Sequence, residues 1–154
     1  MNKNQGGSSR KGSDNRAGSF PQEYLKGGYF DQEGEIKTNL LVDTASRVAK
    51  SFGHGLTTGQ LRRFYGHAKT AEKAFNYSQN EKKLINDIKV LDAFVAEAYG
   101  KENVPENFYK FININTSSIE NSKDIIKGFL PHFQSVVAYH TYHYGENKER
   151  RVNL

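Results

Sequence analysis

Apolar residues return every three or four positions through most of this chain, which is the spacing of amphipathic helices. The pattern predicts a first helix over about 36–52, a second over 57–76 and a third that ends at Tyr99. Pro105 suits the first turn of a short fourth helix, and a last helical region covers 119–144. No stretch alternates as a half-buried strand does, and none carries an Asn-Gly hairpin turn. The expected fold is therefore all-α, a single compact bundle of about five helices.

Small residues and prolines mark the expected ends of these helices. Residues 53–55 (Gly-His-Gly) end the first helix, and residues 76–78 (Asn-Tyr-Ser) break the pattern after the second. Gly100 is expected to stop the third helix as a left-handed C-cap. The polar run over 113–118 is typical of a turn. Pro131 predicts a kink or a restart, because proline removes one helical hydrogen bond.

The N-terminal region differs in composition from the rest of the chain. Residues 1–34 hold seven of the 14 glycines and too few apolar residues to offset the entropy of ordering them. We expect a flexible Gly/Ser/Asn-rich extension over 1–34, disordered to about residue 20, then a helical bundle domain over 35–146 and a charged C-terminal tail over 147–154. Four residues of the extension can dock on the bundle or on a neighbouring subunit: Tyr24, Leu25, Tyr29 and Phe30.

The second helix carries the most informative pattern. Thr57 and Gln60 have the spacing of a capping box, in which each side chain bonds the backbone N–H of the other residue. Beyond the cap, one row at spacing i, i+4, i+7 and i+11 is basic around a bare position, and we call it the basic ridge: Arg62, Gly66, Lys69 and Lys73. Such a row can follow a phosphate backbone, since glycine removes the side chain that would hold the strand away. A solvated helix face is the alternative interpretation.

Composition narrows the class of protein. The chain has 154 residues, a net charge of +5 and a pI near 9.3, which favours a polyanionic partner. Ten Phe and nine Tyr suffice for one modest core. The lack of cysteine excludes disulfides, zinc ribbons, iron–sulfur clusters and a cysteine nucleophile. Because there is neither a signal peptide nor an apolar run of the ~20 residues that a membrane span needs, we expect a soluble cytoplasmic protein.

One enzymatic alternative stays open. Arg62 and His67 form an Arg-x4-His pair that resembles the signature of HEPN-type helical ribonucleases, in which His transfers protons and Arg holds the scissile phosphate. Arg63 stands where that family favours Asn, Asp or His, and five helical residues separate the two side chains by about 140°. His140 and His143 share a helix face but lack a clear third and fourth ligand, so no metal site and no cofactor is predicted.

Three motifs point to one family. Residues 56–63 read Leu-Thr-Thr-Gly-Gln-Leu-Arg-Arg, Gly100-Lys101 follows the long third helix, and Val137-Ala138-Tyr139 precedes further aromatic residues and a glycine. Together, over about residues 36–146, these motifs resemble the small subunit of type III-A CRISPR–Cas (Csm) RNA-guided effector complexes. That family has Leu-Thr-Thr-x-Gln-Ile/Leu-Arg-Lys/Arg in the second helix. It has Gly-Arg where this chain has Gly100-Lys101, and many members have an acidic residue where this chain has Gln134-Ser135.

The resemblance implies a helical protein that is not an enzyme and acts in antiviral defence. Several copies stack in the complex beside the CRISPR RNA and contact the target RNA through its sugar-phosphate backbone, which positions RNA without reading its sequence. The implied partners are target RNA, CRISPR RNA, other subunits and copies of itself, but no membrane. The aromatic end over 139–144 and the exposed edges of the first helix are expected to serve subunit stacking. The expected RNA-binding residues are Arg62 and Arg63 from the motif, Lys69 and Lys73 from the helix face, and Arg47, Lys50 and Lys101 as second choices.

Overall fold

The computed structural model describes residues 18–145, and its regular structure is helical. The only β interaction within these residues is an isolated bridge between Phe30 and Ile36. The all-α prediction is therefore confirmed, whereas the expectations for residues 1–17 and for the tail over 147–154 lie outside the described residues. In chain order the elements are α1 (Thr38–Leu41), α2 (Asp43–Ser51), the 3₁₀ turn η2 (Gly53–Gly55), α3 (Thr58–Ser78), α4 (Glu81–Gly100), α5 (Glu106–Ser118), the π-helix η3 (Asp124–Phe129) and α6 (Leu130–Tyr144).

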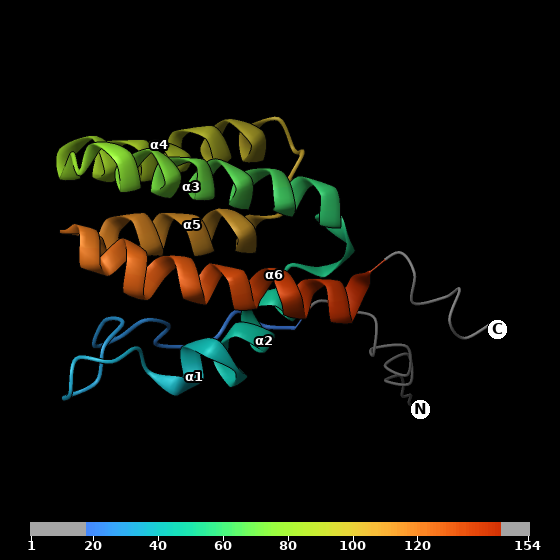
Figure 1. Ribbon diagram of the computed structural model, residues 1–154. Helices are drawn as coiled ribbons and strands as arrows, with labels where there is room; N and C mark the ends of the chain where they lie inside the picture. The colour runs from blue at the N-terminus through green and yellow to red at the C-terminus, as the bar shows by residue number, and fades with distance from the viewer. Residues whose placement is uncertain (1–17, 146–154) are drawn as a thin grey trace, which may run out of the picture.

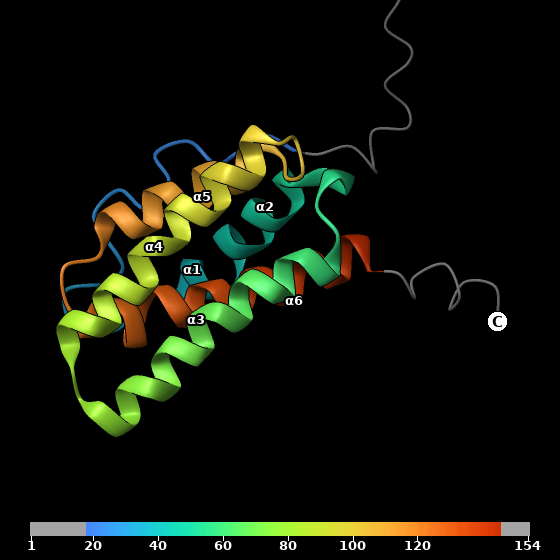
Figure 2. The same cartoon turned by 90° about the horizontal axis from the view of Figure 1, so that it is seen from above.

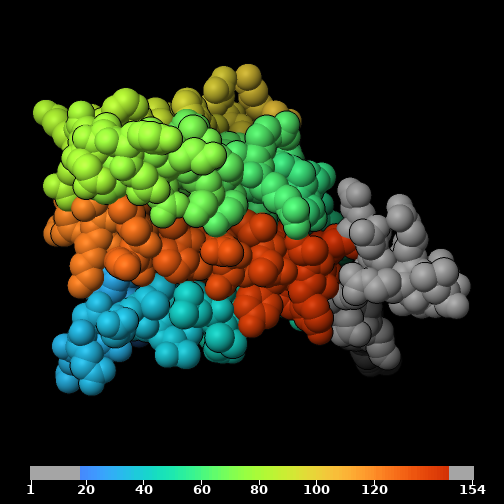
Figure 3. All heavy atoms as spheres, in the orientation of Figure 1, coloured from blue at the N-terminus to red at the C-terminus, as the bar shows by residue number. Residues whose placement is uncertain are grey.

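The four long helices α3 to α6 run alternately in opposite directions, side by side (Figure 1). Seen from above, the axes of these helices slope the same way, although their chain directions alternate (Figure 2). Helix α6 packs against both α3 and α2, so it lies between them. On the face shown in Figure 3, α3, α6 and the α1–α2 region form three successive bands. The second helix of the sequence pattern is thus an outer helix with one side on the bundle.

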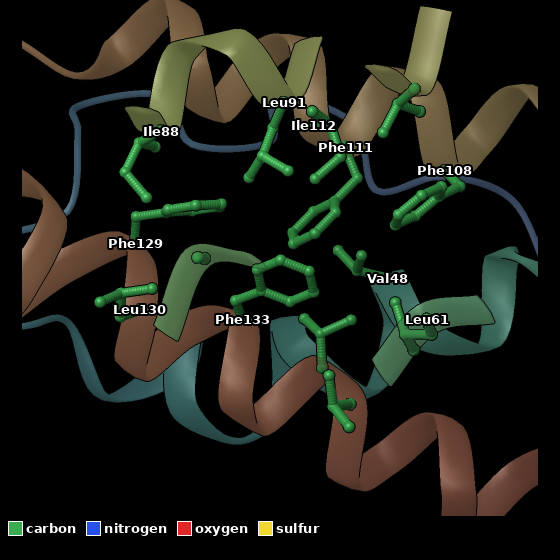
Figure 4. Packing of buried hydrophobic residues seen from close by; sticks show 14 of the residues in the cluster. Val48, Leu61, Ile88, Leu91, Phe108, Phe111, Ile112, Phe129, Leu130 and Phe133 are labelled. Atoms are coloured by element: carbon green, nitrogen blue, oxygen red, sulfur yellow. The ribbon is translucent and has the colours of Figure 1, made fainter. Parts of the chain in front are cut away.

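Phenylalanine rings fill the centre of the bundle (Figure 4). The Phe111 ring of α5 lies with its centroid 5.3 Å from that of Phe133 on α6 and 5.8 Å from that of Phe52 after α2. It also lies 6.4 Å from the ring of Phe129 in η3. All four rings are buried. Since buried aromatic side chains remove large apolar areas from water, this cluster joins three parts of the chain into one core.

The capping box at the start of α3 is confirmed. The Gln60 backbone N–H donates to Thr57 Oγ1 at 3.0 Å, and the Thr57 N–H donates to Gln60 Oε1 at 2.8 Å. Leu56 before the cap and Leu61 after it are both buried. The Gln60 side chain also donates to the Asn103 carbonyl at 2.9 Å. These contacts fix where α3 begins and hold it to the loop that follows α4.

The first predicted helix is interrupted. Helices α1 and α2 are separated at Val42, which has φ −128° and ψ −83°. Just before the break, the Leu40 carbonyl is 2.6 Å from Nδ1 of the buried His132 on α6. A single helix over 36–52 was expected because its apolar spacing is continuous. The bond to a distant histidine, which local spacing does not reveal, accompanies the break.

The predicted turn over 113–118 is wrong, because α5 continues to Ser118. Its polar side chains bond carbonyls one turn earlier: Asn115 Nδ2 donates to Phe111 O at 2.8 Å, and Thr116 Oγ1 donates to Ile112 O at 2.9 Å. Asn115 and Thr116 are also buried. Such residues favour turns when exposed, but bonds to the preceding turn satisfy them inside a helix.

The C-terminus of α4 differs from the expectation as well. Gly100 is the last residue of the helix, and the left-handed position is held by Glu102 at φ +62°. The backbone N–H groups of Glu102 and Asn103 donate to Tyr99 O at 2.9 Å and Ala98 O at 2.8 Å. This is a Schellman motif with Glu where glycine is usual.

The restart expected at Pro131 is confirmed. The π-helix η3 precedes α6, and Pro131 lies in the first turn of α6. There its missing N–H costs less than it would in the middle of a regular helix.

Residues 18–37 pack on the bundle, although the sequence placed residues up to 34 in a flexible extension. Tyr29 is only 3% exposed and donates to Asn115 Oδ1 at 2.8 Å. Asn115 Nδ2 in turn donates to Tyr24 Oη at 2.8 Å, and Tyr24 Oη lies 2.6 Å from His132 Nε2. Burial raises the pKa of both tyrosines, so each keeps its hydroxyl proton as a donor. Of the two docking alternatives, the structure shows docking on the chain's own bundle.

Candidate nucleic-acid interface

The basic ridge lies on the side of α3 that faces away from the core. Leu61, Ala68 and Ala71 are buried on one side of this helix. At about 100° per residue, the four ridge residues fall within an arc of about 60° that lies roughly opposite those three. Every ridge residue is exposed. Helix α3 therefore presents its basic row to solvent, as the spacing predicted.

The three charged residues of the ridge differ in their surroundings. Arg62 Nη2 is 3.5 Å from Thr141 Oγ1 on α6, and within residues 18–145 neither Arg62 nor Lys73 forms an ion pair. Lys69 Nζ donates to Glu72 Oε1 at 2.7 Å, and this hydrogen bond raises the pKa of Lys69. Part of the Lys69 charge is thus balanced within α3. Arg62 and Lys73 are the ridge cations with the most freedom to meet an anion.

Gly66 has no packing role. A Cβ atom added to it would meet no heavy atom within 4 Å. Glycine in a helix interior costs about 1 kcal/mol relative to alanine. Nothing in the described bundle therefore requires glycine at this position.

Next to the ridge, the surface is hollowed. A depression of about 390 Å³ lies along the second half of α3, lined by Lys69, Thr70, Glu72, Lys73 and Asn76. Its two lysines come from the basic ridge, and its one carboxylate is the partner of Lys69. All five lining residues lie on α3, so the depression is an open space between side chains of one helix.

Arg63 and Lys101 lie at the N-terminal end of α3. Arg63 is exposed, about 100° around the helix from Arg62. Lys101 follows α4, and the bond from Gln60 to Asn103 holds this loop beside the start of α3. Lys101 Nζ lies 3.1 Å from Glu97 Oε2. The structure thus brings Lys101 to the same end of the bundle as the first arginines, but with a carboxylate beside it.

Arg47 and Lys50 occupy another place. Both lie on α2, which packs mainly on α6, and α6 lies between α2 and α3 (Figure 1). Arg47 Nη1 is 4.0 Å from Asp43 Oδ2, and both side chains are more than half exposed. The structure therefore divides the seven predicted RNA-binding residues into a main group at α3 and a separate pair on α2.

Tyr77 is a surface residue that the sequence interpretation missed. The second helix was expected to end before residues 76–78, but α3 continues to Ser78 and is capped by Gln79 at φ +55°. Tyr77 is therefore helical, four residues after Lys73, and its relative exposure is 90%. The signal was present in Asn80, which caps α4 by accepting from the Lys83 N–H at 3.0 Å. A cap at residue 80 leaves little room for a loop and allows α3 to extend.

The ribonuclease alternative requires Arg62 and His67 to meet one phosphate. His67 Nε2 lies 3.2 Å from the Asp87 carbonyl of α4, and its ring packs against Phe94 with centroids 5.4 Å apart. Arg62 instead reaches Thr141 on α6. The two side chains therefore turn toward opposite neighbours of α3, as a spacing of five residues implies.

Most histidine and tyrosine side chains at the end of α6 make contacts within the bundle. His140 is buried with Nε2 3.1 Å from Leu56 O, and burial lowers its pKa. Tyr144 Oη donates to Lys50 O at 2.6 Å, while Tyr142 is 70% exposed. In the part of the chain that the structure covers, no three His, Asp or Glu side chains gather as metal ligands would. Of the expected stacking surface, the ring of Tyr142 is the most exposed.

The fold and this surface define a small helical bundle with one outward-facing basic helix. A comparison with protein-family models matches residues 35–146 to the family described as Csm2 Type III-A. The chain therefore belongs to the Csm2 Type III-A family, and it is a small subunit of the type III-A Csm complex. Comparisons with curated proteins and with solved structures found no match. None of the helices described here is long and apolar enough to cross a membrane.

Proposed function

We propose that this small subunit is not an enzyme and that it holds the target RNA in the Csm complex by binding the sugar-phosphate backbone along α3. The single observation that carries this proposal is the exposed basic ridge, which is centred on a glycine that the bundle does not need. Arg62 and Lys73 make the main contacts, with Arg63, Lys69 and Lys101 beside them. Arg47 and Lys50 form a second patch on α2.

Backbone binding suits a subunit of a guided complex. Contacts to phosphate fix the path of a strand but carry no sequence information. Base pairing with the CRISPR RNA then selects the target, and the same subunit serves every target. Protein binding releases cations that are condensed on the RNA. Because added salt opposes this release, the affinity of such contacts falls as the salt concentration rises.

Several copies of the subunit stack with one another and with other subunits of the complex. Exposed apolar side chains supply the surface for these contacts. Val90 and Phe94 lie one turn apart on α4, Val42 lies at the break between α1 and α2, and Tyr142 lies near the end of α6.

The proposal is tested in the assembled complex. Arg62→Glu combined with Lys73→Glu replaces two exposed cations with anions, and neither side chain contributes to the core. We expect the subunit to enter the complex normally and target RNA capture to weaken by about tenfold or more at moderate salt. The matched control is Lys127→Glu, an exposed lysine on η3 away from α3. Unchanged capture by the double variant, with normal subunit content, would overturn the proposal.

The ribonuclease alternative is tested separately. The purified chain and its His67→Ala variant are incubated with single-stranded RNA without added metal, and the RNA is resolved by length. We expect intact RNA in both reactions, because His67 and Arg62 face different helices. Cleavage that disappears in the His67→Ala variant would establish the alternative instead.

A further inference from the structure

Tyr77 continues the basic ridge by one further helical turn. It lies at i+15 from Arg62 and i+4 from Lys73, and at about 100° per residue it falls about 40° around the helix from Lys73. One turn of helix advances about 5.4 Å along the axis. A strand that follows the basic ridge toward the end of α3 therefore reaches the Tyr77 ring directly after Lys73.

The Tyr77 ring is open to solvent, but its backbone is held in place. The relative exposure of Tyr77 is 90%, and among residues 18–145 it has no hydrogen-bond or ring partner. The end of α3 is fixed by Gln79, whose backbone N–H donates to Phe75 O at 2.8 Å. Asn80 then caps α4 immediately. An aromatic ring on a fixed helix end is a rigid platform, with only its side-chain torsions free.

Polar neighbours of Tyr77 distinguish a nucleic acid from an apolar protein partner. Asn76, Ser78, Gln79 and Asn80 are all exposed and polar, so Tyr77 is not part of an apolar patch. Large contiguous apolar patches are what marks protein docking surfaces. A lone aromatic ring beside exposed lysines is instead the combination that binds single-stranded nucleic acid, in which charges hold the backbone and the ring stacks on a base.

We propose that Tyr77 stacks on a nucleobase that is not paired with the guide, in the RNA strand whose phosphates lie on the basic ridge. This inference rests on the proposed function and adds a second kind of contact to it. The ridge cations neutralise phosphates, and Tyr77 fixes the register of the strand by holding one base. Stacking accepts every base, since each has a π-face. The site therefore stays indifferent to sequence.

The test uses the absence of tryptophan from this chain. In the full-length Tyr77→Trp variant the new ring is the only indole fluorophore, and a stacked base quenches its emission. The variant is titrated at low salt with single-stranded RNA, with an abasic strand of the same length and with inorganic polyphosphate. We expect quenching by the RNA and none by the two probes that lack bases. A Tyr99→Trp variant is the control, because the Tyr99 ring already stacks on Tyr109 with centroids 5.7 Å apart.

Affinity provides a second readout. Tyr77→Ala is expected to weaken binding of the RNA by about fivefold or more, while Tyr77→Phe stays within about twofold of the unchanged chain. Both variants keep the fold, because the side chain is almost wholly exposed. For the abasic strand, Tyr77→Ala and the unchanged chain are expected to bind equally.

The outcomes separate the two proposals. One outcome is that RNA binds with strong salt dependence, does not quench the emission of the Tyr77→Trp variant and binds the Tyr77→Ala variant with unchanged affinity. The stacking site is then refuted and the backbone-binding function stands. Quenching by polyphosphate as strong as by RNA also refutes stacking, since it reports charge alone. If no RNA binds even at low salt, both proposals fail.

Discussion

The packing of the bundle gives no reason for a glycine at position 66. It lies in the middle of a helix of 21 residues, where a Cβ would meet only open space. Alanine would be the better helix former, because glycine has more backbone entropy to lose. A strand lying against the bare backbone is the physical reason we give for it.

This reason predicts opposite effects of Gly66→Ala on stability and on binding. The free energy of unfolding should rise by about 0.5–1 kcal/mol, because the change improves helix propensity and creates no clash. Affinity for single-stranded RNA should fall, since a methyl group now separates strand and helix. Urea unfolding and RNA titration of the same samples measure the two effects. A variant that is both more stable and equally good at binding would show that Gly66 has no role in the interface.

The buried His132 predicts that the free energy of unfolding depends on pH. Burial lowers the pKa of His132 to about 4, well below the value of about 6.5 in an unfolded chain. As pH falls below about 6.5, the unfolded state therefore binds one more proton than the folded state, and stability declines. We expect the free energy of unfolding to drop by about 2 kcal/mol between pH 7 and pH 5 on account of this residue.

Urea unfolding at several pH values measures that drop. His132→Gln is the comparison, because an amide can donate to Leu40 O and accept from Tyr24 Oη without titrating in this range. Its stability should change less with pH. His140, whose pKa burial also lowers, contributes a background of the same sign in both proteins. Equal pH dependence of the two proteins would contradict the assignment.

At the scale of elements, apolar spacing predicted which segments are helical but not where they end. The stripes of α3 and α4 are long and regular, and a capping box marks the start of α3. The end of α5 depends on Asn115, whose partners Tyr24 and Tyr29 lie about 90 residues away. No local pattern contains that information. The basic ridge could be predicted because it lies within one helix. Tyr77 was missed because its place depends on the true end of α3, which only the capping residue Asn80 marks.

The contact between η3 and the N-terminal segment supports an element-level prediction. A Cβ added to Gly128 would lie 2.6 Å from Cγ of Tyr29, whose ring is buried. Gly128→Ala must therefore displace the Tyr29 ring, and we expect the free energy of unfolding to fall by about 1–3 kcal/mol. Limited proteolysis should then cut within residues 18–37 sooner than in the unchanged chain.

Gly100→Ala is the matched control for this change. Gly100 ends α4, and an added Cβ there meets no heavy atom within 4 Å. Its stability should be unchanged or slightly higher, because alanine is the better helix former. If both variants lost the same stability, the loss would come from glycine replacement in general and not from the Tyr29 contact.

In the whole molecule, the side of the bundle that packs the N-terminal segment is distinct from the side that exposes the basic ridge. Helix α6 and the packed N-terminal segment stabilise one side, while α3 leaves its basic ridge to solvent on another. Membership of the Csm2 Type III-A family makes this small bundle a subunit of a larger complex. In that setting, we propose, it contributes a fixed, positively charged helix that binds the RNA backbone.

The salt dependence of RNA binding tests this account most directly. For the unchanged chain, for Arg62→Ala with Lys73→Ala, and for Lys127→Ala, affinity for single-stranded RNA is measured across a range of salt concentrations. Each lost phosphate contact should reduce the slope of log K against log salt by about 0.7, so the double variant should lose about 1.4 while the Lys127→Ala control keeps the full slope. Identical slopes for all three proteins would contradict the claim that α3 carries the RNA.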